Sequence, residues 1–165
     1  MISIVATGKW GRGPCDPIPS DPLTGPEGWI GNIGTGHSEY DDLGISHLQN
    51  CFSNMLVGVF LGDNPPSPGA IPSSLTCGTS DMTQPVMQQQ FAVGAALSDV
   101  SVPVGATRLC LGFHDQGGWY NNDGDVVVSI STPVPAVSTW GLVIMGLLVL
   151  TAGTVRILRR GRAAA

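Results

Sequence analysis

The chain has 165 residues, of which 12 % are charged, and it contains 23 glycines and 13 prolines. This composition disfavours long soluble helices and favours short strands joined by turns. Residues 1–133 hold all 12 acidic residues but only three of the seven basic ones, a formal charge of −9. The acidic body argues against nucleic acid as a partner and is compatible with a divalent cation.

The apolar pattern predicts five strands along the body. A strand at residues 2–6 leads into a glycine-rich turn. Residues 16–50 are predicted to be a long irregular loop, because four prolines in this region prevent a regular helix. The run at 55–61 predicts a second strand, and a proline- and serine-rich loop follows over 62–85. Further strands are predicted at residues 90–97, 108–113 and 126–130. This spacing predicts a small, mostly β domain over residues 1–130, an antiparallel β-sandwich of jelly-roll type.

Four cysteines, Cys15, Cys51, Cys77 and Cys110, are scattered through the body. None forms a CxxC pair, which argues against a zinc ribbon or a thioredoxin site. Exported proteins can form disulfides, and four cysteines allow three complete pairings, among which the sequence does not choose. The alternative is that some of them are small buried apolar residues.

Oxygen-bearing side chains gather after the predicted strand at 108–113. Asp115 is followed by two glycines, an aromatic pair, Asn121 and Asn122, and then the last strand. A carboxylate and two carboxamides on a glycine-rich loop are the ligand types that calcium prefers. The aromatic pair offers flat apolar faces on which a sugar can stack. The alternative is a plain hairpin turn, in which Asn, Asp and Gly are the usual residues.

Residues 105–130 resemble the end of the LecA (PA-IL) family of calcium-dependent galactose-binding bacterial lectins. The shared order is a hydrophobic strand, an Asp, a glycine-containing loop, an Asn-Asn pair, a glycine and a last strand of alternating Ser and Val. Residues 2–14 and 55–62 also resemble family segments. The resemblance implies a small galactose-binding β-sandwich. It also implies that an N-terminal strand of the family is missing here, which would leave an unpaired sheet edge.

The resemblance further implies a set of site residues. The calcium ligands would be the side chains of Asp115, Asn121 and Asn122 and the backbone carbonyls of Arg12 and Trp119. The sugar-binding residues would be Asp115, Gln116, Trp119, Asn121, His37 and Tyr40. The family binds galactose with a His and a Gln from the long loop before the central strand. The corresponding loop of this chain, within 16–50, lacks that pair. The ligand is therefore expected to be a galactose-type or another glycan.

The last part of the chain has the pattern of a membrane segment. No charged residue occurs from Val126 to Val155, and Arg159 and Arg160 belong to a basic cluster at the end. Residues 140–158 therefore predict a single transmembrane helix that begins at an interfacial Trp140. The positive-inside rule puts the basic end, 159–165, in the cytoplasm and the acidic body outside.

The segment before this helix resembles the IPTL-CTERM class of bacterial sorting signals, which is related to the PEP-CTERM class. The resemblance covers residues 134–162, in the order motif, helix and basic stop, and it rests on Val134, Pro135, Ser138, Trp140, Gly141, Arg159 and Arg160. Residues 131–139 would then be a linker and the sorting motif. The resemblance implies recognition at the membrane by a sorting protease of exosortase type.

Two functions remain open. The first is an exported surface protein with a calcium-dependent carbohydrate-binding domain, anchored initially in the inner membrane of the cell envelope. The second is a structural or biofilm-matrix envelope protein in which calcium, if bound, only stabilises the fold. An enzyme is not expected, because the chain has no nucleophile motif, zinc spacing or phosphate loop. No basic and apolar signal segment precedes residue 2, so we expect the sequence to be truncated at its N-terminus, with Met1 inside a strand.

Overall fold

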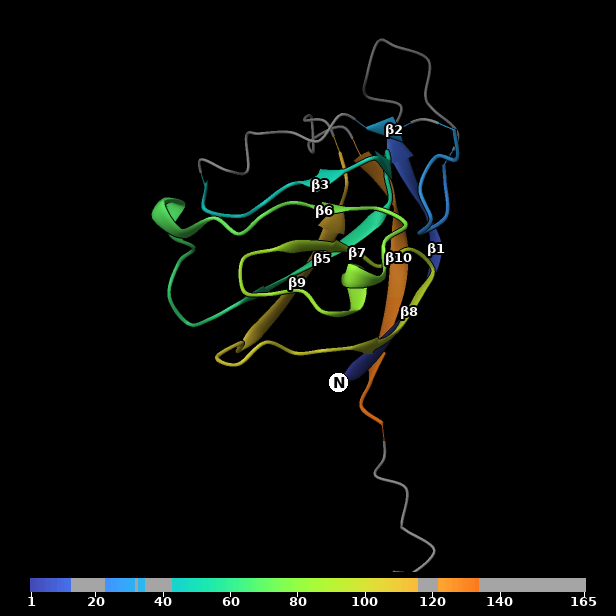
Figure 1. Ribbon diagram of the computed structural model, residues 1–165. Helices are drawn as coiled ribbons and strands as arrows, with labels where there is room; N and C mark the ends of the chain where they lie inside the picture. The colour runs from blue at the N-terminus through green and yellow to red at the C-terminus, as the bar shows by residue number, and fades with distance from the viewer. Residues whose placement is uncertain (13–22, 32, 35–42, 116–121, 134–165) are drawn as a thin grey trace, which may run out of the picture. The chain divides into compact units, whose positions relative to one another are not determined.

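The computed structural model describes residues 1–12, 23–31, 33–34, 43–115 and 122–133. Over these residues the protein is mostly β, and its two three-stranded sheets are antiparallel, as expected for the predicted β-sandwich (Figure 1). The predicted linker, sorting motif and transmembrane helix lie, apart from residues 131–133, outside the described residues. Within the described ranges, none of the helices has both the length and the apolar character needed to cross a bilayer.

The first sheet has the strand order β10–β1–β8. Its central strand, β1 (Ile2–Arg12), is antiparallel to β10 (Asn122–Ser131) over nearly its whole length, as Figure 1 shows, and β8 (Ala96–Val100) pairs with its other edge. Alternate residues of β1 face the core, so that Ile4 and Ala6 are buried. Both terminal strands are longer than predicted, because each continues as the other's hydrogen-bonding partner beyond its apolar run.

The second sheet has the order β7–β5–β9. The central β5 (Leu56–Leu61) and β9 (Arg108–Phe113) confirm the strands predicted at 55–61 and 108–113. β5 is flanked by glycine, proline and asparagine, and every one of its residues except Val59 is buried. Such a short apolar run bounded by turn residues is typical of a buried central strand.

The prediction of one strand over 90–97 was wrong. The structure divides this segment into β7 (Gln90–Ala92) and β8, which belong to different sheets. Gly94 lies between them with φ of +60°, a left-handed conformation that glycine adopts without steric cost. The segment therefore carries the chain from one sheet to the other.

The core lies between the two sheets and includes buried residues from both of them. Phe60 and Phe91 stack with ring centroids 5.3 Å apart. Gly58 lies under the Phe91 ring, so close that an added Cβ would be 2.6 Å from its Cζ. The buried apolar residues are Ile4, Ala6, Trp10, Leu48, Cys51, Leu56, Val57, Phe60, Leu61, Met82, Phe91, Val93 and Val100.

The two predicted loop regions contain short regular elements. In the described part of 16–50, β2 (Ile33–Gly34) pairs with β4 (Cys51–Phe52). β3 (Leu48–Gln49) pairs in parallel with β6 (Leu75–Thr76), so the pairing is not antiparallel throughout. Two 3₁₀ turns, η2 (Pro68–Ala70) and η3 (Ser80–Thr83), complete the second loop region.

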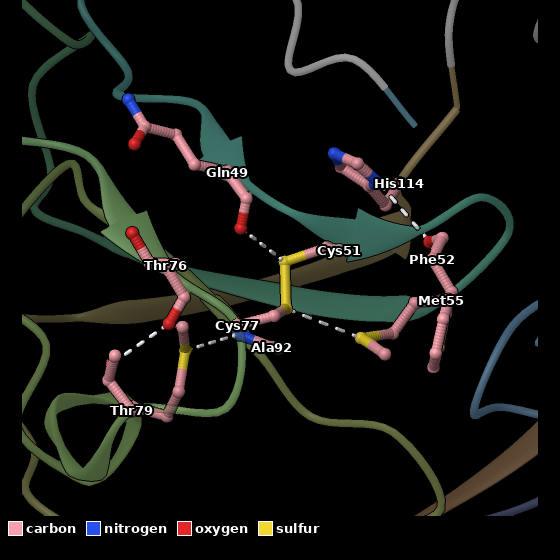
Figure 2. Close-up of a disulfide and its surroundings, with 10 residues drawn as sticks. Gln49, Cys51, Phe52, Met55, Thr76, Cys77, Thr79, Ala92 and His114 are labelled. Carbon is pink, nitrogen blue, oxygen red and sulfur yellow. Dashed lines mark hydrogen bonds between the residues drawn. A yellow bond between two sulfur atoms is a disulfide. The ribbon is translucent and has the colours of Figure 1, made fainter. Parts of the chain in front are cut away.

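A disulfide between Cys51 and Cys77 joins these short elements (Figure 2). Cys51 is fully buried in β4, whereas Cys77 is half-buried directly after β6. The sequence left three pairings open, and the fold selects this one because the β3–β6 pairing brings residue 77 beside the chain at 49–51. Cys110 is an exposed free thiol on β9, and Cys15 lies outside the described residues.

Candidate functional site

The backbones of two predicted calcium ligands lie opposite each other. Arg12 is the last residue of β1 and Asn122 is the first residue of β10, and they are direct partners in the antiparallel ladder. They are 110 positions apart in the sequence, and the register of the two terminal strands brings them together. The side chains of these two residues are outside what the structure describes.

A chain of contacts connects the end of β9 to the end of β1. The rings of Trp10 in β1 and Phe113 in β9 are in contact, with centroids 3.6 Å apart. The indole Nε1 of Trp10 donates a hydrogen bond of 2.6 Å to the Asn54 carbonyl. The Asn54 N–H in turn donates to the His114 carbonyl at 2.8 Å. The two sheets are therefore connected close to the point where Arg12 ends one strand and Asp115 follows another.

His114 fixes the backbone directly before Asp115. It is 6 % exposed, and its N–H donates to the Met55 carbonyl at 2.8 Å. Its ring Nδ1 lies 3.2 Å from the Phe52 carbonyl, as Figure 2 shows, and because a carbonyl only accepts, Nδ1 is the protonated nitrogen in this bond. Asp115 itself is half-buried. The backbone that leads into Asp115 is thus held by a buried and hydrogen-bonded neighbour.

The loop after Asp115 does not close a hairpin. The sequence predicted a tight loop between adjacent strands, but β9 pairs with β5 and β10 pairs with β1. The two strands belong to different sheets, so the segment between them connects the two sheets. The interpretation of this segment as a plain hairpin turn was therefore wrong, because the two strands that it joins pair with different partners in different sheets.

The remaining predicted site residues belong to segments that the structure does not describe. Gln116, Trp119, Asn121, His37 and Tyr40 lie outside the described residues. In the part of the chain that is described, no three His, Cys, Asp or Glu side chains gather as a possible metal site. The predicted calcium set has a different chemistry, since it consists of one carboxylate, two carboxamides and backbone carbonyls, all of which are oxygen donors that suit this ion.

Two carboxylates near this position had not been singled out from the sequence. Asp123 and Asp125 follow Asn122 in β10, and both are exposed. The Asp123 carboxylate accepts a hydrogen bond of 2.8 Å from the Gly124 N–H, and Asp125 lies opposite Lys9 in the ladder. Their sequence signal was the DGD run before the last strand, which looked like a turn and is in fact part of β10.

The loop at 23–31 brings an aromatic residue to the same end of β1. The backbones of Trp10 and Thr24 exchange two hydrogen bonds, of 3.0 and 2.7 Å. The N–H of Trp29 donates to the Ser53 carbonyl at 2.7 Å, directly before Asn54. Trp29 is half-buried and the adjacent Ile30 is 76 % exposed. The sequence alone suggested only an irregular proline-rich loop here.

A separate apolar cavity of about 250 Å³ lies on the outer face of the second sheet. Its walls include Val57, Val59 and Leu61 of β5 together with Cys110 and Ile45. These side chains offer few hydrogen-bonding groups, whereas a sugar needs many. The cavity therefore does not fit the polar ligand that the sequence predicts.

No protein-family model matches the chain, and no curated protein or solved structure matches it significantly. The resemblances to the LecA family and to the sorting signals therefore remain predictions that rest on the residues quoted for them.

Proposed function

We propose that this protein is an exported surface protein whose β-sandwich binds carbohydrate through calcium and whose C-terminal segment is a sorting signal. The observation that carries the proposal is the pairing of Arg12 with Asn122 at the end of the first sheet. Arg12 and Asn122, which the LecA resemblance implies as ligands from two separate segments, are neighbours in the ladder although they come from opposite ends of the domain.

The contacts around Asp115 support the same proposal. The Trp10, Asn54 and His114 interactions tie the end of β9 to the end of β1. A calcium site whose ligands come from separate segments needs a rigid scaffold that holds those segments together. The described contacts of Trp10, Asn54 and His114 support a scaffold of that kind directly before Asp115.

The proposed chemistry is ligand exchange. Asp115, Asn121 and Asn122 would supply side-chain oxygens to Ca²⁺, and Arg12 and Trp119 would supply backbone carbonyls. Two vicinal hydroxyls of a glycan would complete the coordination shell. The Trp119 ring would stack on the sugar, and Gln116, His37 and Tyr40 would supply hydrogen bonds. No covalent bond is made or broken, so the protein acts as a lectin.

The disulfide supports an exported body. Disulfides form and persist in oxidising compartments such as the cell envelope and are rare in the cytosol. Cys51 is fully buried in its bond to Cys77. Export agrees with the proposed tail, in which the helix at 140–158 holds the protein in the inner membrane with the C-terminus in the cytoplasm. An exosortase-type protease would then recognise the motif that begins at Val134.

The test of carbohydrate binding is a glycan array probed with the purified chain in calcium and again after chelation. We expect binding in calcium and at least a tenfold loss in the chelator. Equal binding in both conditions would disprove the calcium mechanism. Calcium-dependent melting without binding to any glycan would favour the alternative of a structural envelope protein in which the ion only stabilises the fold.

The sorting tail is tested separately in a bacterium that carries an exosortase-type protease. A Pro135→Ala, Trp140→Ala variant of an exported fusion should accumulate in the membrane uncleaved, while the parent fusion loses its C-terminal epitope. The matched control is Thr132→Ala, just before the motif, which should be processed like the parent. Normal processing of the double variant would exclude the motif as a recognition element.

A further inference from the structure

We propose that the free edge of β10 is a self-association surface, at which β10 of one copy pairs antiparallel with β10 of a second copy. On one side β10 pairs with β1, and no strand of the described residues pairs with its other side. β10 has 10 residues, whereas the other edge strands, β8, β7 and β9, have 5, 3 and 6. This inference does not depend on calcium or on a glycan.

β10 has only two charged side chains on its edge, Asp123 and Asp125, and both lie in its first half. Natural edges are kept short or carry lysine or proline, which oppose pairing with another chain. Residues 122–131 contain neither lysine nor proline. Val127 is 63 % exposed and Ile130 is 51 % exposed. An exposed, long and apolar edge of this kind is a template for another strand.

The inner side of this edge is also open. A shallow cavity of about 230 Å³ lies beside the end of β10, and Ile130, Ile2, Phe60 and Leu109 are among its lining residues. It therefore lies between the two sheets, where β10 and β9 are the edge strands. A second strand added at β10 would cover part of this apolar surface, which favours association.

The pleat restricts how two copies of β10 can pair. Val126 and Val128 pack against the core, so the even-numbered residues face inward and Val127 and Ser129 face outward. A two-fold axis perpendicular to the sheet keeps the inward faces of both copies on the same side. Directly opposite residues must then both face inward or both face outward. The pairing has to be centred on a residue and not between two residues.

Side-chain chemistry selects Val127 as the centre. In that register Val127 lies opposite Val127 of the second copy, and Val126 lies opposite Val128. The two carboxylates lie opposite hydroxyl groups: Asp125 is opposite Ser129, and Asp123 is opposite Ser131. Centring on Asp125 would oppose two carboxylates, and centring on Val126 would oppose Asp125 and Val127. Like charges and mismatched pairs directly opposite each other are destabilising.

The occupant is therefore a second copy of this chain, because this register places apolar residues opposite apolar ones and keeps the carboxylates of the two copies from lying opposite each other. Lys9, which lies opposite Asp125 in the β1–β10 ladder, further offsets the charge of that carboxylate. The product is a continuous six-stranded sheet. A contact made by a single pair of edge strands is small compared with a standard interface, so we expect a dissociation constant in roughly the micromolar range.

The first test is sedimentation velocity of the full chain in a mild detergent. The parent should dimerise, and Val127→Lys should weaken the dimer at least tenfold. Val5→Lys is the matched control, because Val5 is 50 % exposed on the same outer face but lies on the central strand β1. It should leave the dimer unchanged. A parent that stays monomeric at about 200 µM, or two lysine variants that behave alike, would overturn the proposal.

The second test is position-specific cross-linking in a background with Cys15→Ser and Cys110→Ser. Val127→Cys should form an intermolecular disulfide, because the two residues face each other on the axis. Ser129→Cys should not, because two copies of residue 129 would be about 13 Å apart along the strands, beyond the reach of a disulfide. A mixture of Asp125→Cys and Ser129→Cys chains should cross-link. Association driven by the tail would give equal yields at 127 and 129, and that result would exclude pairing through β10.

Discussion

The indole N–H of Trp10 donates a hydrogen bond of 2.6 Å to the backbone carbonyl of Asn54, 44 residues away in the sequence. Trp10 belongs to the first sheet, and Asn54 lies two residues before β5 of the second sheet. Both residues are buried, at 5 % and 8 % exposed. This bond therefore ties the two layers together at the end of the sandwich where we propose the calcium site.

Replacing Trp10 by phenylalanine should separate this hydrogen bond from the ring packing. Trp10→Phe keeps an aromatic ring near Phe113 but leaves the Asn54 carbonyl without this donor, so we expect a loss of about 1–2 kcal/mol in the free energy of unfolding. Trp10→Ala also removes the ring and should cost about 3–5 kcal/mol. Urea denaturation measures both. The control Trp29→Phe, at a half-buried position, should lower the free energy of unfolding by less than about 1 kcal/mol. A Trp10→Phe protein with an unchanged free energy of unfolding would show that the hydrogen bond contributes nothing.

Adding one methyl group at Gly58 should disturb the core. A Cβ at this position would be 2.6 Å from Cζ of Phe91, a fully buried ring that is also stacked on Phe60. Because the added group would clash with this buried ring, Gly58→Ala should destabilise the protein by about 1–3 kcal/mol. Gly69→Ala adds the same group where the nearest neighbouring atom is 4.0 Å away and should change stability by less than about 0.5 kcal/mol. Thermal melting compares the stability of the two variants. Equal melting temperatures would contradict the packing argument.

Removing the disulfide should destabilise the fold without changing its topology. Cys51 and Cys77 are 26 positions apart, and a cross-link closing a loop of that size contributes about 3 kcal/mol in the chain-entropy view. A Cys51→Ala, Cys77→Ala variant and the reduced parent should therefore both melt earlier than the oxidised parent. Cys110→Ser, at an exposed free thiol, should melt like the parent. A parent whose melting does not respond to reductant would refute a stabilising role for this bond.

Neutralising Asp115 should weaken calcium binding selectively. Asp115→Asn keeps the size of the side chain and removes the only carboxylate of the proposed ligand set, so we expect at least about a tenfold loss of calcium affinity, since affinity follows ligand charge. Isothermal titration calorimetry measures it. Asp63→Asn, at an exposed position in the turn after β5, removes the same charge from the body and should bind calcium like the parent. If both variants lose affinity equally, general electrostatic attraction and not a site explains the binding.

Several features of the fold were predictable from the sequence because they depend on local pattern. The strands at 55–61 and 108–113 were found because each is a short apolar run bounded by turn residues. The segment at 90–97 was misassigned because its apolar pattern continues through Gly94, where the backbone turns into the other sheet. An apolar pattern records which residues are buried, and it does not record against which sheet they are buried.

Composition and apolar pattern by themselves determined that this chain forms a mostly β body. The residue types after the strand at 108–113 identified Asp115 and the Asn-Asn pair as oxygen donors. The tertiary structure alone decided that Arg12 lies opposite Asn122, that Cys51 bonds to Cys77, that β9 and β10 separate into different sheets and that one edge of β10 is left without a described partner. The reason is physical. A strand's tendency to form is encoded within its own few residues, whereas its choice of partner is a competition among all the strands of the chain, settled by the apolar area that the whole sandwich buries.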